Sequence, residues 1–467
     1  AGFRDYMLDK YLKRLQENGF TTAVYSQDTP SKNTTRSLSG IYSPGTYFSA
    51  ETKTLSNNAT CIWLFCAGKN VHIGVANVDI FTGRTAAFEF TTTDYHNPTS
   101  FDELERYISV YDPAELIFVH QMDEARLDDI ITFAGANERC IHRVNLGSES
   151  NRLVKMAKNC EKQTYQNEIL ARFGFGADGE HQAHLLFGEH ALCATAFCFL
   201  LDYVHCHNPD LVNRLQPPVL ENKTDRVLLA NHSLKQLNMV DDSQYVGKLS
   251  SVSRFLNNCV TNMGRRRFHY KVLNPIVDCE TLEESYDVTE HLTGRDDLDW
   301  FRSTLRGVKD IEKLERKRLL RRITPFDFAQ LHDNLLVTVQ LAARIADDVY
   351  LTHRTEEAIG TSLAELAQSC TGISECLDEA FDLSKCRGLD TLNFHKRAAD
   401  MEAGASAGGA SEEADAIAVS FVRRGVCERI DAKVRANLES RDKLECIRAL
   451  LNTLVASSEK KSKTTDF

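Results

Sequence analysis

The apolar residues change their spacing near residue 150, and this change limits the possible folds more than any other feature of the sequence. Residues 59–93 contain three short runs rich in β-branched and aromatic residues, CIWLFC, VHIGVANVDI and RTAAFEFTTT, which turns at 68–70 and 82–83 separate. This pattern predicts an antiparallel meander. Beyond residue 150 the apolar residues recur at helical spacing, which predicts a helical domain. The expected fold class is therefore α+β, with several domains.

A helix and a strand on either side of Pro113 are expected to complete a compact α/β unit with the meander. Residues 100–111 have helical spacing, with Ser100 as the N-cap and Glu103 three residues later. ELIFVH (115–120) then reads as a buried strand. Further upstream, residues 1–26 predict a helix with Tyr11, Leu12 and Leu15 on one face, a strand at 21–27, and a polar loop from 28 to 39.

The run HQAHLLFGEHALCATAFCFLLDYVHCH (181–207) is apolar nearly all round, which predicts a helix buried inside a helical domain. A short strand is expected at 227–231, and amphipathic helices from 244 to about 390. Residues 400–415 have the composition of a solvated loop. In the last helix, the apolar residues are spaced as in a coiled-coil seam; they are Leu444, Ile447, Leu451 and Leu454. No apolar stretch is long enough for a membrane span.

Charge and cysteine content narrow the functional classes. The 467 residues include 66 Asp and Glu against 55 Lys and Arg, a net charge of −11. This balance excludes a global electrostatic attraction for nucleic acid and leaves only local basic patches. The 14 cysteines contain no CxxC pair, which is typical of reduced thiols in an intracellular protein. Nucleus, mitochondrion, nucleoid and viral factory all remain open as its location.

The common catalytic motifs are absent from the sequence. Gly68-Lys69 and Gly247-Lys248 are followed by Asn70 and Leu249, so neither fits a P-loop, and GxSxG, HExxH and GxGxxG do not occur. Cys198, His205, Cys206 and His207 are too close in sequence for all to reach one metal, so core packing is expected there. Asp79 and Glu89 lie in the predicted strands, where a two-metal nuclease is the remote alternative to ordinary turn and surface acids.

Three basic segments are candidates for contacts with a phosphate backbone. Arg265 and Arg267 lie in GRRRFHYK, which contains no acid. In KDIEKLERKRLLRR (309–322), Lys313, Lys317 and Arg321 would share a helix face. For both segments, the favoured interpretation is a solvated face, with i,i+4 ion pairs to Glu312 and Glu315 in the second. The third candidate is the predicted loop that carries Lys32 and Arg36.

Several motifs in the correct order resemble the MutS family of DNA mismatch repair proteins. YLKRLQENGFTTAVYSQ and the turn Ser43-Pro44-Gly45-Thr46 resemble the end of the family's mismatch-binding domain. VANVDIFTGR, with Gly83 in its turn, and FDELERYISVYDPAELIF resemble the connector domain. NHSLKQLNMV, SVSRFLNNCVTNMGRRRFHYKVLNPIVD and DIEKLERK resemble the lever domain. The last group includes the family-motif positions Met263, Gly264, Arg266 and Pro275.

The resemblance implies a domain order. Residues 1–50 would be the C-terminal part of the mismatch-binding domain, and 51–150 an α/β, RNase H-like connector. Residues 151–420 would form the helical core or lever, and 421–467 a helix that leads into the clamp. The family's Phe-x-Glu motif is not found upstream, and Phe101-Asp102-Glu103 lies in the connector. No ATPase segment follows the last helix, so we expect a partial MutS chain.

The resemblance also implies function. The intact family member would be a dimer that encloses bent, mismatched double-stranded DNA, and ATP with Mg²⁺ would convert it to a sliding clamp. A MutL-type protein would dock on the connector. This chain alone would bind no ATP and have no catalytic or metal residues. Arg36 and, less directly, Lys32 correspond to DNA-facing positions, whereas Gly264 and Arg266 are expected to support helix packing. The alternative is a MutS-related helical scaffold that binds protein partners or DNA junctions without mismatch repair.

Overall fold

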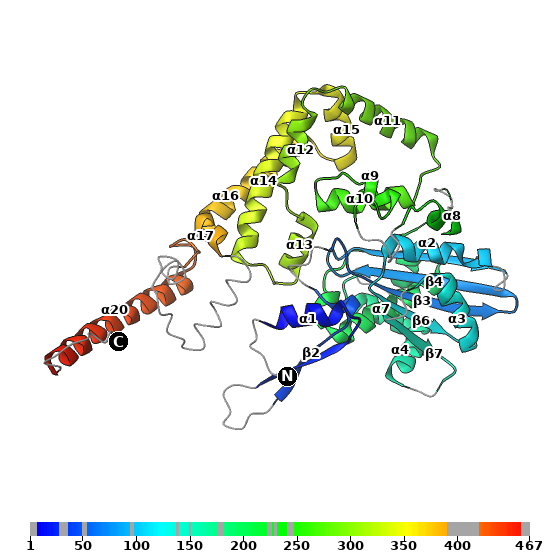
Figure 1. Ribbon diagram of the computed structural model, residues 1–467, viewed down its shortest axis with the longest axis horizontal. Helices are drawn as coiled ribbons and strands as arrows, with labels where there is room; N and C mark the ends of the chain where they lie inside the picture. The colour runs from blue at the N-terminus through cyan, green and yellow to red at the C-terminus, as the bar shows by residue number, and fades with distance from the viewer. Residues whose placement is uncertain are drawn as a thin grey trace. The chain divides into compact units, whose positions relative to one another are not determined.

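The computed structural model describes residues 7–27, 36–48, 54–93, 98–136, 140–148, 151–175, 182–221, 227, 231–240, 247–389 and 420–458. They fall into two compact units, Ala1–Ile323 and Thr324–Phe467 (Figure 1). The first combines a sheet with helices, and the described part of the second contains helices joined by short segments. The prediction of a mixed α/β chain with a mainly helical C-terminal part is confirmed. Its finer division into domains stays a prediction.

A six-stranded sheet forms the centre of the first unit, in the order β7-β6-β3-β4-β5-β8. The strands are β3 (Asn58–Ala67), β4 (Asn70–Asp79), β5 (Thr85–Thr92), β6 (Glu115–His120), β7 (Ile141–Asn145) and β8 (Val219–Leu220). β3, β4 and β5 are antiparallel neighbours, which confirms the predicted meander. β6 pairs in parallel with β3, so the strand predicted at 115–120 is confirmed as well.

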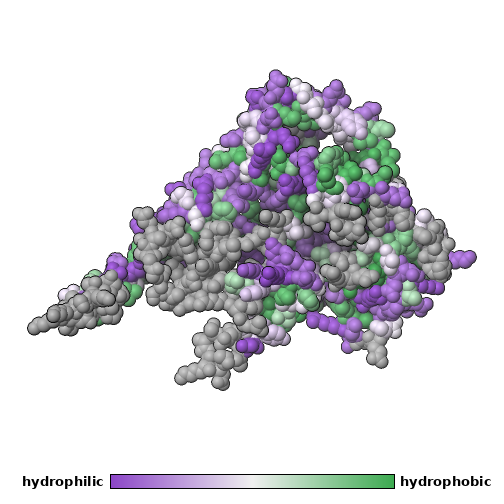
Figure 2. Space-filling model, viewed as in Figure 1, coloured by the Kyte–Doolittle hydropathy of each residue, from purple (hydrophilic) through white to green (hydrophobic). Residues whose placement is uncertain are grey.

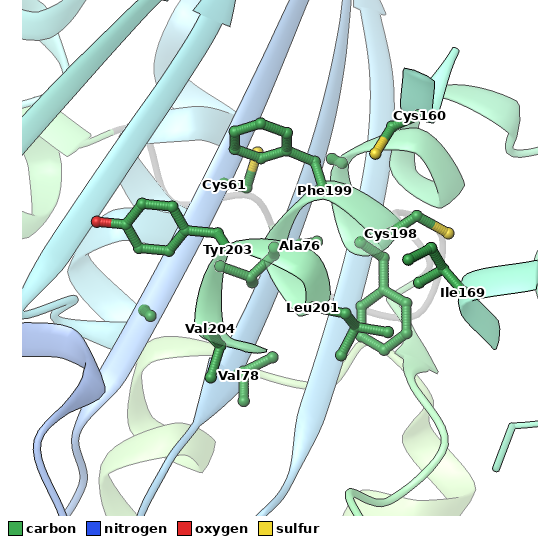
Figure 3. Close-up of a cluster of buried hydrophobic side chains, with 14 of the residues drawn as sticks. Cys61, Ala76, Val78, Cys160, Ile169, Cys198, Phe199, Leu201, Tyr203 and Val204 are labelled. Carbon is green, nitrogen blue, oxygen red and sulfur yellow. The ribbon is translucent and has the colours of Figure 1, made fainter. Parts of the chain in front are cut away.

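Helices cover both faces of this sheet. Because successive strand residues point to opposite faces, Ile62 and Leu64 pack with α2 (Asp102–Tyr111) and α3 (Glu124–Phe133). Cys61 and Trp63 face the opposite helical layer. That layer comprises α4 (Arg152–Cys160), α5 (Gln163–Arg172), α6 (Gln182–Phe187) and α7 (Ala191–His207). Figure 3 shows Phe199 and Tyr203 of α7 close to Cys61 and Ala76 of the sheet.

The single helix predicted over 181–207 is wrong, because α6 ends before Gly188 and α7 begins at Ala191. Gly188 has a φ of +56°, a left-handed conformation that interrupts a right-handed helix. The expected burial inside a helical domain is also wrong, because α7 packs on the sheet. An apolar circumference shows that a helix is buried but does not identify what covers it.

The start of α7 contacts the sheet at two residues, a glycine of β4 and the glutamate of β5 that is paired with it. A Cβ on Gly74 would lie 2.5 Å from the carbonyl carbon of Leu192, so only glycine allows this approach. The carboxylate of Glu89 accepts hydrogen bonds from the backbone N–H groups of Leu192 (2.9 Å) and Cys193 (3.0 Å). Glu89 is therefore a partner of a helix N-terminus and not a surface acid.

The N-terminal segment forms α1 (Leu8–Gln16) and the two-stranded sheet of β1 (Thr22–Gln27) and β2 (Arg36–Tyr42). Of the predicted apolar face, only Leu12 is buried, while Tyr11 and Leu15 are each 39% exposed. The polar loop predicted to reach residue 39 is wrong from Arg36 onward, because β2 pairs with β1 there. A short helical turn, η2 (Pro44–Thr46), follows.

The first unit continues through several short helices. They are η5 (Pro209–Val212), α8 (Asn231–Gln236), α9 (Val252–Leu256), α10 (Asn262–Leu273), α11 (Cys279–Thr293), α12 (Leu298–Arg306) and α13 (Ile311–Leu319). The N-caps of α10, α11 and α13 are Thr261, Asp278 and Asp310, each of which accepts a backbone N–H in the first turn. Most of the strand predicted at 227–231 lies outside the described residues, and its last residue, Asn231, begins α8.

In the second unit the described helices are α14 (Pro325–Ala346), α15 (Val349–Ile359), α16 (Leu363–Ala380), α17 (Leu383–Gly388) and α20 (Glu428–Ser458). The loop predicted at 400–415 lies outside the described residues. The predicted seam residues of α20 are 40–65% exposed. Among the helices that the structure describes, none is long and apolar enough to cross a membrane.

Candidate functional site: the junction between the sheet and helices α9–α13

The turn that follows β4 places a buried carboxylate at the end of the sheet. Asp79 accepts hydrogen bonds from the backbone N–H groups of Asn57 (3.0 Å) and Phe81 (3.1 Å) and from the hydroxyl of Thr82 (2.6 Å). Burial raises the pKa of Asp79, although these hydrogen bonds lower it. Gly83 closes the turn with a φ of +75°. Since Asp79 is engaged in the turn and no metal-binding group occurs among the described residues, nothing here supports a nuclease site.

A buried arginine of α13 packs against this turn. The guanidinium of Arg316 donates to the carbonyl oxygens of Asn213 (2.8 Å), Ile80 (3.4 Å) and Leu211. Its side chain also passes Gly83, where an added Cβ would approach it to 3.2 Å. Burial lowers the pKa of Arg316 to about 10, although the neighbouring Asp79 carboxylate raises it. Arg316 thus joins α13 to two separate segments of the sheet region, the turn after β4 and the η5 segment.

The basic face predicted on residues 309–322 does not exist as expected. The ammonium of Lys313 lies 4.5 Å from the centroid of the Phe81 ring and donates to the carbonyl of Thr54 at 2.6 Å. Lys317 is buried, and Arg321 lies beyond the end of α13 with a φ of +56°. Packing turns Lys313 and Lys317 inward, so the phosphate-tracking face of Lys313, Lys317 and Arg321 is wrong. The expected solvated face is present in part, because Arg318 is exposed and pairs with Glu315.

Arg266 of α10 forms the most extensive ion pair of the junction. Its guanidinium binds both carboxylate oxygens of Asp310 (2.7 and 2.8 Å) and one oxygen of Glu312 (2.5 Å). It also donates to the carbonyl of Leu55 at 3.0 Å. Burial lowers the pKa of Arg266, but the two carboxylates outweigh that effect and raise it above its usual value. Glu312 in turn accepts a hydrogen bond from Arg84, at the end of the β4–β5 turn.

A second buried network joins the other end of α10 to α2. Arg106 donates to the side chains of Asn274 (2.6 Å), Glu103 (3.2 Å) and Glu221 (3.4 Å). Glu221 also accepts a hydrogen bond from the hydroxyl of Tyr111 at 2.6 Å. Sequence reasoning missed this network, because an arginine on an amphipathic helix normally faces solvent. Together with Arg266 it attaches both ends of α10 to the sheet region.

The remaining family-motif positions have local roles in the structure. The hydroxyl of Thr261 accepts the backbone N–H of Gly264 at 3.0 Å, and a Cβ on Gly264 would lie 2.9 Å from that oxygen. Pro275 accepts a hydrogen bond from the backbone of Val227 at 2.9 Å. Met263 lines the cleft described below.

The Pro44-Gly45 turn lies on a buried glutamate that sequence reasoning missed. Glu115 accepts hydrogen bonds from Ser43 (2.6 Å) and the backbone N–H of Gly45 (3.1 Å) through one oxygen. Through the other it accepts hydrogen bonds from His142 (2.6 Å) and Tyr203 (2.8 Å). A glutamate that begins the apolar strand ELIFVH was the available signal. Burial raises the pKa of Glu115, but the contacts with His142, Ser43 and Tyr203 outweigh it, so that the pKa is lowered.

Replacement of Glu115 by Gln is expected to lower the free energy of unfolding at pH 7 by about 2–4 kcal/mol, because an amide cannot accept all four hydrogen bonds. The folded-state pKa lies below the usual 4.5. The carboxylate therefore stabilises the fold above pH 4.5, and this contribution is lost as the pH falls through the folded-state pKa.

Urea unfolding at pH 7 and at about pH 3.5 measures this contribution. Between these two pH values, the free energy of unfolding should fall less in the variant than in the parent. The control is Glu283→Gln, on the exposed side of α11. An equal acid-induced loss in the parent and in Glu115→Gln would contradict the prediction.

Between the sheet and helices α9, α10 and α12 lies an open cleft of about 1590 Å³. Its lining includes eight Arg and Lys residues and four Asp and Glu residues, in a chain where acids are in excess. The predicted backbone-contact residues Arg265 and Arg267 both line it and are exposed. Arg36 is exposed on β2 and does not line the cleft, while Lys32 lies outside the described residues. Figure 2 shows apolar and hydrophilic side chains side by side over α9 and α10.

Comparisons with known proteins show similarity to one family, both for the helical part and over most of the chain. Residues 232–464 match the family MutS domain III. A putative DNA mismatch repair protein, a mutS homolog of Acanthamoeba polyphaga mimivirus, is 25% identical over 376 residues, which cover 74% of this chain and 33% of the relative. The DNA mismatch repair protein MutS of Caldanaerobacter subterraneus subsp. tengcongensis is 22% identical over 347 residues, which cover 71% and 36%. For MutS of Methanosarcina barkeri the identity is 22% over 398 residues, which cover 81% and 41%. The chain thus spans about a third to two-fifths of the length of these relatives.

Proposed function

Because this chain belongs to the MutS family, we propose that it functions in DNA mismatch repair of the MutS type, as the part that couples the DNA-binding region to the helices that follow. In this proposal, residues 51–150 act as the connector together with α4–α7, which pack on their sheet, and the helices within residues 232–464 act as the lever. The intact assembly is a dimer that encloses a mismatched duplex, where weak stacking makes a kink inexpensive. A MutL-type partner docks on the connector.

The observation that supports a coupling role is the double attachment of α10 and α13 to the sheet region. Arg266 binds Asp310, Glu312 and the backbone at Leu55, and Arg316 is buried among three loop carbonyls. Hydrogen-bonded charges that are withdrawn from solvent hold their elements in one geometry more strictly than apolar contacts do. When the sheet region moves, α10 and α13 are therefore expected to move with it as one body.

ATP and Mg²⁺ are expected only because the chain belongs to the MutS family. The described residues do not fit a nucleotide site. Gly68-Lys69 forms the turn between antiparallel β3 and β4, whereas a P-loop leads from a strand into a helix. Gly247-Lys248 precedes α9, which has only five residues, and is followed by leucine in place of serine or threonine. No step of the proposed coupling is assigned to ATP on these residues.

The test compares binding of a mismatched and a perfectly paired duplex by the longest expressed form of the protein that carries this chain. Fluorescence anisotropy over a series of salt concentrations, with and without ATP, gives the affinity ratio and the salt slope. We expect tighter binding to the mismatch, and release from the mismatch into sliding when ATP is added to a duplex with blocked ends. Equal affinity for both duplexes would contradict the mismatch function.

Equal, weak binding to both duplexes would instead favour the second candidate function, a MutS-related scaffold for protein partners or DNA junctions. The net charge of −11 favours this candidate, because acidic surfaces repel the phosphate backbone and suit protein partners. A four-way junction in the same assay separates the two scaffold forms, because only a junction-binding scaffold prefers it to the paired duplex.

A further inference from the structure

Five of the exposed cations that line the open cleft between the sheet and helices α9, α10 and α12 form what we call the basic cleft; they are Lys248, Arg265, Arg267, Arg302 and Arg306. Three of the four carboxylates that share this lining have other partners. Asp79 is bound within its turn, Glu312 binds Arg266 and Arg84, and Glu221 binds Tyr111 and Arg106. Within the part of the chain that the structure describes, no carboxylate pairs with any of the five cations. Three of these four acids are thus engaged with other groups, while the five cations lie together in one lining.

The loop before α10 draws three of these cations together. Lys248 donates to the side-chain oxygen of Asn258 (3.3 Å), and Arg302 donates to the carbonyl of the same residue (3.2 Å). Arg265 donates to the carbonyl of Cys259 at 3.0 Å. Each of these bonds uses one N–H of a group that has three or five. The loop thus orients the side chains and leaves most of their donors available to a ligand.

The size of the cleft and the chemistry of its donors indicate the class of ligand. A volume of about 1590 Å³ exceeds the roughly 300–1,000 Å³ that a small ligand fills. The cations come from three separate segments, the loop before α9, α10 and α12, so one phosphate could not contact all of them. Four of the five are arginines, whose planar guanidinium groups match phosphate oxygens in pairs. An extended chain of phosphates meets these requirements.

We propose that the basic cleft binds the phosphodiester backbone of a DNA strand. The choice of DNA rests on the proposed function. The cleft would add a sequence-independent contact, because phosphate contacts fix position and carry no base information. The strand could belong to a duplex or to single-stranded DNA, and the backbone chemistry is the same in both.

The test uses the 467-residue chain and measures binding of fluorescent dT20 and of a paired 20-base-pair duplex by anisotropy at several salt concentrations. The variant Arg265→Gln/Arg302→Gln removes two cleft cations. The control Lys433→Gln/Arg435→Gln removes two exposed cations from α20, with the same change of net charge. For dT20 we expect the cleft variant to bind about tenfold more weakly near 0.1 M salt and to lose about 1.4 from the salt slope, since each single-strand phosphate contact contributes about 0.7. The control should bind like the parent.

Each outcome bears on a different part of the proposal. Equal affinities and slopes for the cleft variant and the control would overturn it, provided that thermal unfolding shows both to be folded like the parent. Inorganic triphosphate, added as a competitor, should displace dT20 less well than unlabelled dT20 does at equal total phosphate. Equal competition would overturn the assignment of a strand and indicate a short polyphosphate as the ligand.

The two labelled DNAs distinguish the form of the strand. A larger loss of affinity in the cleft variant for dT20 than for the duplex identifies single-stranded DNA, and the reverse identifies duplex. If mismatch discrimination fails but the cleft variant still loses binding, the repair function is wrong and the cleft assignment stands.

Discussion

Arg316→Met is expected to destabilise the first unit by about 3–5 kcal/mol, a fall in its melting temperature of roughly 6–15 °C. The guanidinium donates to the carbonyl oxygens of Asn213, Ile80 and Leu211, which come from two separate parts of the chain. Methionine fills a similar length but has no donor, so buried carbonyls lose their partner at about 1–3 kcal/mol each. The variant also removes a favourable charge near buried Asp79. The free energy lost in this way is expected to exceed the desolvation cost that the variant avoids by no longer burying a cation.

The matched control is Arg318→Met on the same helix. Arg318 is about half exposed and pairs only with Glu315, three residues earlier. Surface pairs of this kind contribute between about 0 and 1 kcal/mol, so its unfolding should be close to that of the parent. Differential scanning calorimetry measures both, with the transition of the first unit followed separately. A melting temperature for Arg316→Met within about 2 °C of the control would show that burial of this cation costs as much as its hydrogen bonds contribute.

Gly74→Ala is expected to destabilise the first unit by about 3 kcal/mol, because the new methyl group has no room. The added Cβ would lie 2.5 Å from the carbonyl carbon of Leu192 and 2.7 Å from the nitrogen of Cys193. Both are backbone atoms at the start of α7, so no flexible side chain can move aside. A shift of the helix would also lengthen the two hydrogen bonds from Leu192 and Cys193 to Glu89.

The same substitution at Gly372 is expected to have the opposite sign. Gly372 lies inside α16, and a Cβ there would meet no atom within 4 Å. Alanine favours a helix interior over glycine by about 0.5–1 kcal/mol, so Gly372→Ala should raise the stability of the second unit. Urea unfolding of the two variants, followed by circular dichroism, compares them directly. Stabilisation by both substitutions, or no effect of Gly74→Ala, would show that α7 can move off β4 without cost.

Local pattern was sufficient for much of the fold and for the family. The period of two and the glycine turns predicted β3, β4 and β5 at almost their observed bounds, and Pro113 marked the step from helix to β6. The ordered motifs around Gly83, Gly264 and Pro275 indicated the MutS family, to which the chain belongs. Each of these signals spans a few residues, so backbone conformation and nearest neighbours account for it.

Which distant segments meet was decided by tertiary structure. The sequence by itself showed that α7 is buried, but the close approach at Gly74 and the acceptor Glu89 placed it on a sheet and not among helices. Lys313 carries a charge that usually faces solvent, yet the packing of α13 turns it onto Phe81. Likewise, Arg265 and Arg302 are 37 positions apart in sequence and share a cleft only because α10 and α12 come together. Periodicity reports which face of an element is apolar, whereas the choice of partner depends on shape, on paired charges and on hydrogen bonds between segments remote in sequence.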